Sequence, residues 1–143
     1  MKLKHALIIC LAVFFIISQV SADENIDEFI NCTNITFEGI GFSIPVGFNE
    51  SKDSEDFTDL GSDGETCFYV NDAQGEIIIT VISDWMGMSL DELKQPGSKK
   101  AEINGYTGWN YTKDNLHYFA YIKDDKGVIV GVTNETRLSQ VIV

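Results

Sequence analysis

The most regular apolar pattern in the chain lies at residues 76–83, Glu-Ile-Ile-Ile-Thr-Val-Ile-Ser. Its apolar side chains occupy both faces of a strand: Ile77, Ile79 and Val81 on one, Ile78 and Ile82 on the other. A strand that is apolar on both faces is typical of the centre of a covered sheet. β-branched side chains are stiff at χ1 and favour a strand over a helix. The pattern predicts a central strand that is covered on both sides at least in part.

Further apolar segments separated by turn residues predict an antiparallel meander around this strand. We expect the other strands at residues 35–45, 67–70, 101–103, 106–112, 116–122 and 128–132. Asn104-Gly105 is the strongest two-residue hairpin signal, and further turns are expected at 71–75, 113–115 and 124–127. Residues 49–65 are polar and are predicted to form a long loop, with room for one helical turn.

Two short helices complete the predicted fold. Ser89 is a good N-cap for residues 90–94, with Glu92 at the capping-box position. Leu138, Val141 and Ile142 have helical spacing at the end of the chain. The predicted class is α+β: an antiparallel sheet of about six strands with a short internal helix and a C-terminal helix packed on it.

Residues 1–22 have the organisation of a secretory signal peptide. A basic start is followed by an apolar run at residues 6–17 and by Val20 and Ala22 at the small-residue positions before a cleavage site. We expect cleavage after Ala22, a lead-in at 23–34 and a single domain at 35–143. The alternative is that the run stays uncleaved as a membrane anchor, although it is shorter than a typical span of about 20 residues.

The charge of the chain excludes one class of partner. Removal of Lys2 and Lys4 with the signal lowers Lys plus Arg from 10 to 8 against 22 acids, which gives a net charge of −14. Such a field repels nucleic acid and anionic lipid surfaces. We therefore expect no nucleic-acid partner, and contact with a membrane only if the N-terminal run is uncleaved. The sequence identifies no ligand, partner or cofactor.

Two cysteines, Cys32 and Cys67, remain after the signal. An even count in an exported chain predicts a disulfide between them. In the chain-entropy model, a disulfide that closes the loop between Cys32 and Cys67 stabilises the fold by about 3–4 kcal/mol. The alternative is two free thiols.

Five N-glycosylation sequons follow the signal, at Asn31, Asn34, Asn49, Asn110 and Asn134. Nine asparagines and 17 serines or threonines in residues 23–143 would give roughly 1.3 sequons by chance. The excess predicts surface glycosylation, as in eukaryotic secretory or archaeal cell-surface proteins. Coincidence in a threonine-rich strand protein is the alternative. A glycan on Asn110 would require Trp109 and Tyr111 to face the other way.

Candidate chemistry is sparse in the rest of the chain. His117 is the sole histidine after the signal, so it cannot build a multi-histidine zinc site, and no G-x-S-x-G pattern accompanies it. The acidic segment 53–65 does not fit an EF-hand, because its third and twelfth ligand positions fail. An aromatic binding face for a sugar or peptide is a further hypothesis, formed by Trp85, Trp109, Tyr106, Tyr111, Tyr118 and Tyr121. Such residues in strands also serve as core or cross-strand pairs.

The segment Phe42-Ser43-Ile44-Pro45-Val46-Gly47-Phe48 resembles the opening strand of PsbP/DcrB-like domains. In that family the opening strand is followed by an antiparallel meander and a closing helix. The same order is found here in the turns at Asn104-Gly105 and 124–127 and in the apolar spacing at 138–142. The resemblance implies an antiparallel sheet with flanking helices and a non-enzymatic, often extracytoplasmic accessory role. It implies no catalytic or ligand-binding residue. The chain also resembles small acidic exported proteins of methanogenic archaea.

We therefore expect an exported, non-enzymatic accessory or binding domain. The alternatives are an extracellular hydrolase that uses carboxylates or His117, and a membrane-anchored surface assembly component.

Overall fold

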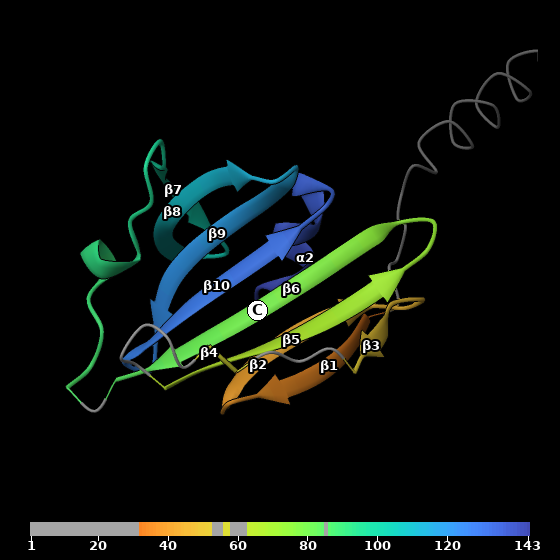
Figure 1. Ribbon diagram of the computed structural model, residues 1–143, viewed down its shortest axis with the longest axis horizontal. Coiled ribbons are helices and arrows are strands. Elements are labelled where there is room, and N and C mark those ends of the chain that lie inside the picture. Colours follow the sequence, from red (N-terminus) through yellow and green to blue (C-terminus); the bar gives the residue numbers. More distant parts are fainter. Residues whose placement is uncertain (1–31, 53–55, 58–62, 85) are drawn as a thin grey trace, which may run out of the picture. The chain divides into compact units, whose positions relative to one another are not determined.

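The computed structural model of the protein describes residues 32–52, 56–57, 63–84 and 86–143 (Figure 1). One compact unit runs from Cys32 to Val143. The predicted signal peptide and most of the predicted lead-in lie outside the described residues. Within the described residues, no helix is both long and apolar enough to span a membrane.

The domain is mostly antiparallel sheet with one short C-terminal helix, which confirms the α+β prediction in outline. A main sheet has the strand order β3-β5-β6-β10-β9-β8-β7, with β4 also paired to β5, and β1 and β2 form a separate two-stranded sheet. The strands are β1 (Cys32–Phe37), β2 (Ile40–Pro45), β3 (Asn49–Ser51), β4 (Asp56–Phe57), β5 (Asp63–Asn71), β6 (Gly75–Ser83), β7 (Lys99–Ile103), β8 (Tyr106–Lys113), β9 (Leu116–Lys123) and β10 (Lys126–Val132). The helical segments are η1 (Leu90–Leu93), η2 (Glu135–Arg137) and α2 (Leu138–Val141).

The sheet is not one continuous meander. After β6 the chain passes through η1 to the far edge at β7, and then returns through β8 and β9 to β10 (Figure 1). β10 closes the sheet by pairing with β6, with Val130 opposite Ile79. β6 therefore lies inside the sheet as predicted, between its predicted hairpin partner β5 and the strand β10, which is distant in the sequence and was not predicted as its neighbour.

The first predicted strand, residues 35–45, is in fact a hairpin. Glu38 and Gly39 have φ of 50° and 78° and form a two-residue turn between β1 and β2. The same positive-φ geometry occurs at the predicted Asn104-Gly105 turn, and it is the backbone that a two-residue hairpin needs. The predicted loop at 49–65 is also partly wrong, because it contributes β3, β4 and the start of β5.

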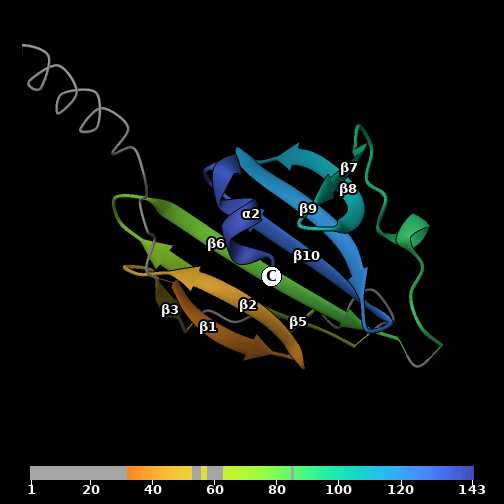
Figure 2. The ribbon, with the colours of Figure 1, turned by 180° about the vertical axis from the view of Figure 1, so that it is seen from behind.

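One face of the main sheet is sealed by β2 and α2, which lie side by side against it (Figure 2). Phe42 of β2 and Ile142 after α2 form an antiparallel bridge, and both are fully buried. The sheet contributes alternate side chains of each strand to this core, among them Ile77, Ile79, Val81, Phe119, Tyr121, Val128, Val130 and Val132. Burial of each such aliphatic side chain stabilises the fold by about 1.5–3 kcal/mol.

The opposite face is covered at one end only. Leu93 of η1 packs on Ile82, Trp109 and Ala120, and Trp109 Nε1 donates a hydrogen bond to the Leu90 carbonyl oxygen at 2.9 Å. A Cβ at Gly127 would overlap the side chain of Met88, so this glycine lets the η1 segment approach β10. The prediction of partial cover on both sides of β6 is confirmed at Ile82, which is 7% exposed, whereas Ile78 is only half-buried.

The end of the chain is held by the β7–β8 turn. The side-chain nitrogen of Asn104 donates to the carbonyl oxygens of Ser139, at 2.7 Å, and Ile142, at 2.6 Å. These bonds satisfy carbonyl groups that a helix C-terminus leaves without intrahelical partners. The predicted C-terminal helix is confirmed, with α2 shorter than the expected segment.

The predicted disulfide between Cys32 and Cys67 is not formed in the structure, where both thiols are free. Cys32 is the first residue of β1, an exposed strand, whereas Cys67 points from β5 into the sealed core and is 3% exposed. Burial, with a smaller effect from Glu50, raises the pKa of Cys67 to about 12. The exposed start of β1 and the buried side of β5 thus place the two thiols in different environments.

We predict that Asn104→Gly lowers the free energy of unfolding by about 1–3 kcal/mol, because it keeps the positive φ and removes both hydrogen bonds. Asn115→Gly is the matched control: Asn115 has φ of 64° in the β8–β9 turn, and its side chain makes no hydrogen bond within the described part of the chain. Urea unfolding measures both variants. Equal losses would contradict the role of Asn104.

Alkylation of the folded protein by iodoacetamide is expected to modify Cys32 and leave Cys67 intact, because the reactive thiolate of Cys67 is suppressed by burial. In urea both should react. Peptide mapping under non-reducing conditions measures the outcome. A linked Cys32–Cys67 peptide would show instead that the bond forms in the native protein.

Candidate functional site

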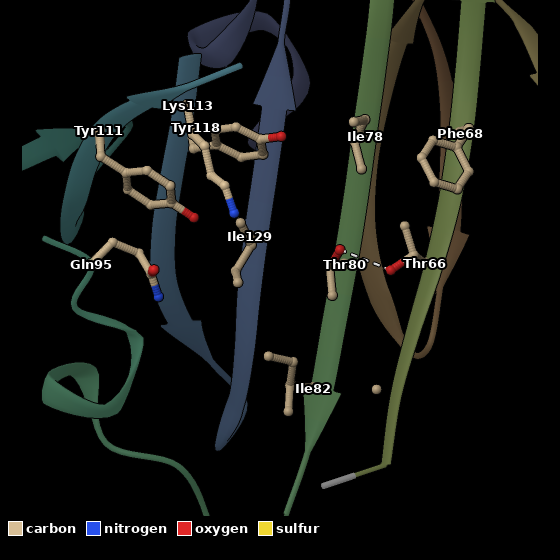
Figure 3. A pocket seen from close by; sticks show the side chains of 11 residues that line it. Thr66, Phe68, Ile78, Thr80, Ile82, Gln95, Tyr111, Lys113, Tyr118 and Ile129 are labelled. Carbon is tan, nitrogen blue, oxygen red and sulfur yellow. Dashed lines mark hydrogen bonds between the residues drawn. The ribbon is translucent and has the colours of Figure 1, made fainter. Parts of the chain in front are cut away.

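The uncovered part of the second sheet face forms a groove with a volume of about 280 Å³ (Figure 3). Its floor crosses five strands, β5, β6, β10, β9 and β8, and one wall comes from the segment after η1. The lining residues are Gly64, Thr66, Phe68, Ile78, Thr80, Ile82, Gln95, Tyr111, Lys113, Tyr118 and Ile129. None of these is an acid, a histidine or a cysteine.

The floor of the groove is apolar because it is the second face of buried strands. Ile78 and Ile82 alternate with the core residues of β6, and Phe68 does the same on β5. The two polar floor residues, Thr66 and Thr80, share a hydrogen bond of 2.9 Å between their hydroxyl groups. Their polar atoms are therefore bonded to each other, and the floor offers few free hydrogen-bonding groups.

Two tyrosines form the other side of the groove. The rings of Tyr111 and Tyr118 are stacked, with centroids 5.1 Å apart and an interplanar angle of 9°. A Cβ at Gly131 would overlap the Tyr118 ring, so this glycine on β10 clears space for the ring. Cross-strand packing and a glycine thus fix the position of both rings before any ligand binds.

Burial keeps both phenols protonated. It raises the pKa of Tyr111 to about 12, with a smaller contribution from Tyr118. It also raises the pKa of Tyr118, to which the negative charges of Glu76 and Asp114 add. Each hydroxyl group is therefore a hydrogen-bond donor over the whole physiological pH range.

The cation of the groove is Lys113, at the end of β8. In the view of Figure 3 its ammonium group lies near Ile129, and the Tyr111 hydroxyl group points to the same part of the groove, with Gln95 nearby. Lys113 is exposed and has no hydrogen-bond or ion-pair partner in the described part of the chain. The groove thus has an apolar floor and a cluster of donors at one end.

The predicted aromatic face is divided by the fold. Tyr111 and Tyr118 line the groove, but Trp109 is buried beneath η1. The ammonium groups of Lys94 and Lys100 lie 4.9 and 5.8 Å from the centroid of the Trp109 ring. Tyr106 and Tyr121 pack together on the sealed face, with centroids 4.9 Å apart, and Trp85 lies outside the described residues.

His117 is not in the groove. On β9 it alternates with the groove residue Tyr118 and lies on the same face as Phe119 and Tyr121, which is the opposite face of the sheet.

A second, shallow hollow of about 300 Å³ lies at the β5–β6 turn and includes Asp72 and Glu76. Within the described ranges no three His, Cys, Asp or Glu side chains lie together as a metal site would need. Most of the acidic segment 53–65 lies outside those ranges.

The described sequons occupy different environments. Asn34, Asn49 and Asn134 are exposed, whereas Asn110 is half-buried and its side-chain nitrogen donates to Glu135 Oε1 at 3.4 Å. Trp109 and Tyr111 do face the other side of β8 from Asn110. Asn31 lies outside the described residues.

We predict glycans on Asn34, Asn49 and Asn134 and none on Asn110, because a glycan there would displace a half-buried amide from its hydrogen bond. The test is expression in a host that glycosylates exported chains, followed by peptide-N-glycosidase treatment and mass analysis of asparagine-to-aspartate conversion. The Asn110→Gln variant should have the unaltered mass pattern. Conversion at Asn110 would contradict the assignment, and absence of conversion everywhere would remove the glycosylation hypothesis.

Comparisons with known proteins do not assign the chain to a family. No family, no curated protein and no solved structure is significantly similar to the chain.

Proposed function

We propose that the protein is an exported, non-enzymatic binding or accessory domain that holds its ligand in the open groove of the main sheet. The observation that carries this proposal is the incomplete cover of the second sheet face by the residues that the structure describes. A preformed, mostly apolar hollow with a few polar groups is the usual form of a small-ligand site. Export and surface glycosylation are supported by the sequence of residues 1–22 and by the exposed sequons.

The shape of the groove supports binding without catalysis. The described residues that line it include no carboxylate or imidazole for general acid–base chemistry, and His117 is on the other face of β9. The alternative of a hydrolase would have to use a different surface. The other alternative, a membrane-anchored assembly component, depends on residues 1–22 and is compatible with the same groove.

The resemblance to PsbP/DcrB-like domains supports the same accessory role. Antiparallel sheet with a closing helix is what that resemblance implies, and the described domain has these elements. The site residues come from the groove alone, since the resemblance supplies none.

The proposal predicts saturable binding of Nile red, a neutral apolar dye, with a blue-shifted emission. Ile78→Gln and, separately, Phe68→Gln should each weaken binding about tenfold, because both place a polar amide on the floor of the groove. Val46→Gln is the matched control, since Val46 is 60% exposed and lies outside the groove.

Circular dichroism confirms that each variant is folded before its affinity is compared. Equal binding by all three variants would place the dye elsewhere, and absence of saturable binding by the unmodified protein would remove the proposal.

A further inference from the structure

We infer that the ligand of the groove is a long-chain amphiphile with an anionic head group, whose chain lies on the apolar floor and whose head is held by Lys113 and Tyr111. This inference rests on the proposed function and deepens it. The size, polarity and charge of the groove together indicate the chemical class of the ligand.

The volume restricts the occupant to a small molecule or a single chain. At about 280 Å³ the groove is at the lower end of the range of small-molecule sites, which begins near 300 Å³. Because it crosses β5, β6, β10, β9 and β8, it spans four inter-strand spacings of about 4.8 Å, or roughly 19 Å. The groove is therefore long enough for an extended chain.

The polarity of the floor favours an acyl chain over a peptide. A peptide on this face could not pair its backbone with β6 or β10, because both strands are already hydrogen-bonded to neighbours on both sides. Thr66 and Thr80 are also bonded to each other. Buried peptide groups would therefore lack partners, and each unpaired group costs about 1–3 kcal/mol. An acyl chain has no polar groups to satisfy.

The charge at one end favours an anionic head. Lys113 is the only charged residue that lines the groove within the described part of the chain, although the whole protein has a net charge of −12. Among the described residues its ammonium group has no hydrogen-bond or ion-pair partner, and in the view of Figure 3 the Tyr111 hydroxyl group points to the same part of the groove. A carboxylate accepts hydrogen bonds from both groups, and such charge-assisted bonds are stronger than neutral ones.

The exposure of the donors agrees with this arrangement. Lys113 and Gln95 are exposed, Tyr111 is half-buried, and the floor residues Thr66 and Ile82 are buried. The head group would therefore remain in contact with water while the chain is removed from it. Burial of methylene groups supplies the affinity, at about 0.8 kcal/mol per group. The positive charge of Lys113 favours a head group with a negative charge.

The test measures the affinity of the exported protein for three probes that share one chain: laurate, methyl laurate and dodecylammonium. Displacement of Nile red reports each binding event below the critical micelle concentration. Laurate should bind about ten- to a hundredfold more tightly than methyl laurate. Dodecylammonium should bind most weakly, because its charge repels that of Lys113.

Lys113→Met keeps the aliphatic stem and removes the charge, so it should bring laurate to the affinity of methyl laurate and leave methyl laurate unchanged. Tyr111→Phe should weaken laurate by a smaller factor. Lys99→Met, at an exposed lysine of β7 outside the groove, is the matched control and should change neither affinity.

The outcomes separate this inference from the proposed function. Equal affinities for laurate and methyl laurate, or a laurate preference that survives Lys113→Met, would overturn the anionic amphiphile while leaving the groove as the binding site. Binding of an unstructured apolar peptide in preference to all three probes would also overturn it. Failure of Nile red itself to bind the groove would instead remove the proposed function.

Discussion

The two faces of the main sheet are covered unequally, and this imbalance governs the rest of the domain. The β1–β2 hairpin and α2, which is the only α-helix among the described residues, pack on the same face of the main sheet. Their contacts converge at Phe42 and Ile142, which are fully buried and paired through the backbone. Burial of β6 and β10 against this layer forms the larger hydrophobic cluster of the domain. The second face has only the smaller cluster beneath η1, and the groove residues beside it are left open by the described part of the chain.

η1 decides how much of that second face remains open. The long connection from β6 to β7 must cross from the middle of the sheet to its edge, and it does so over β10, β9 and β8. Trp109 anchors it through its ring and its hydrogen bond to Leu90, and Gly127 permits its close approach. The cover ends near Gln95, and beyond it no layer formed by the described residues lies over the floor. The groove is thus a consequence of the length and anchoring of one connection.

Local patterns predicted most elements of the fold. Period-2 alternation and turn chemistry located β6, β8, β9 and β10, because both signals arise from neighbouring residues. The β1–β2 hairpin was missed because Glu38-Gly39 is a weaker turn signal than Asn104-Gly105, although Gly39 adopts the same positive φ. The pairing of β6 with β5 was predicted from the turn at residues 71–75, but its pairing with β10 was missed. Pairing between β6 and β10 joins residues about fifty positions apart, and no local signal encodes it.

The sequence by itself determined the strands, the turns and the aromatic residues from which a site could be built. Only the tertiary structure decided which of those aromatics share a surface. Tyr111 and Tyr118 meet because β8 and β9 are paired and Gly131 clears space for one ring. Trp109 is on the same face but lies under η1, whereas Tyr106 and Tyr121 are on the sealed face. Alternation assigns residues to two faces, but the assignment of one face to the core and the other to a ligand depends on which face the distant β1–β2 hairpin and α2 cover.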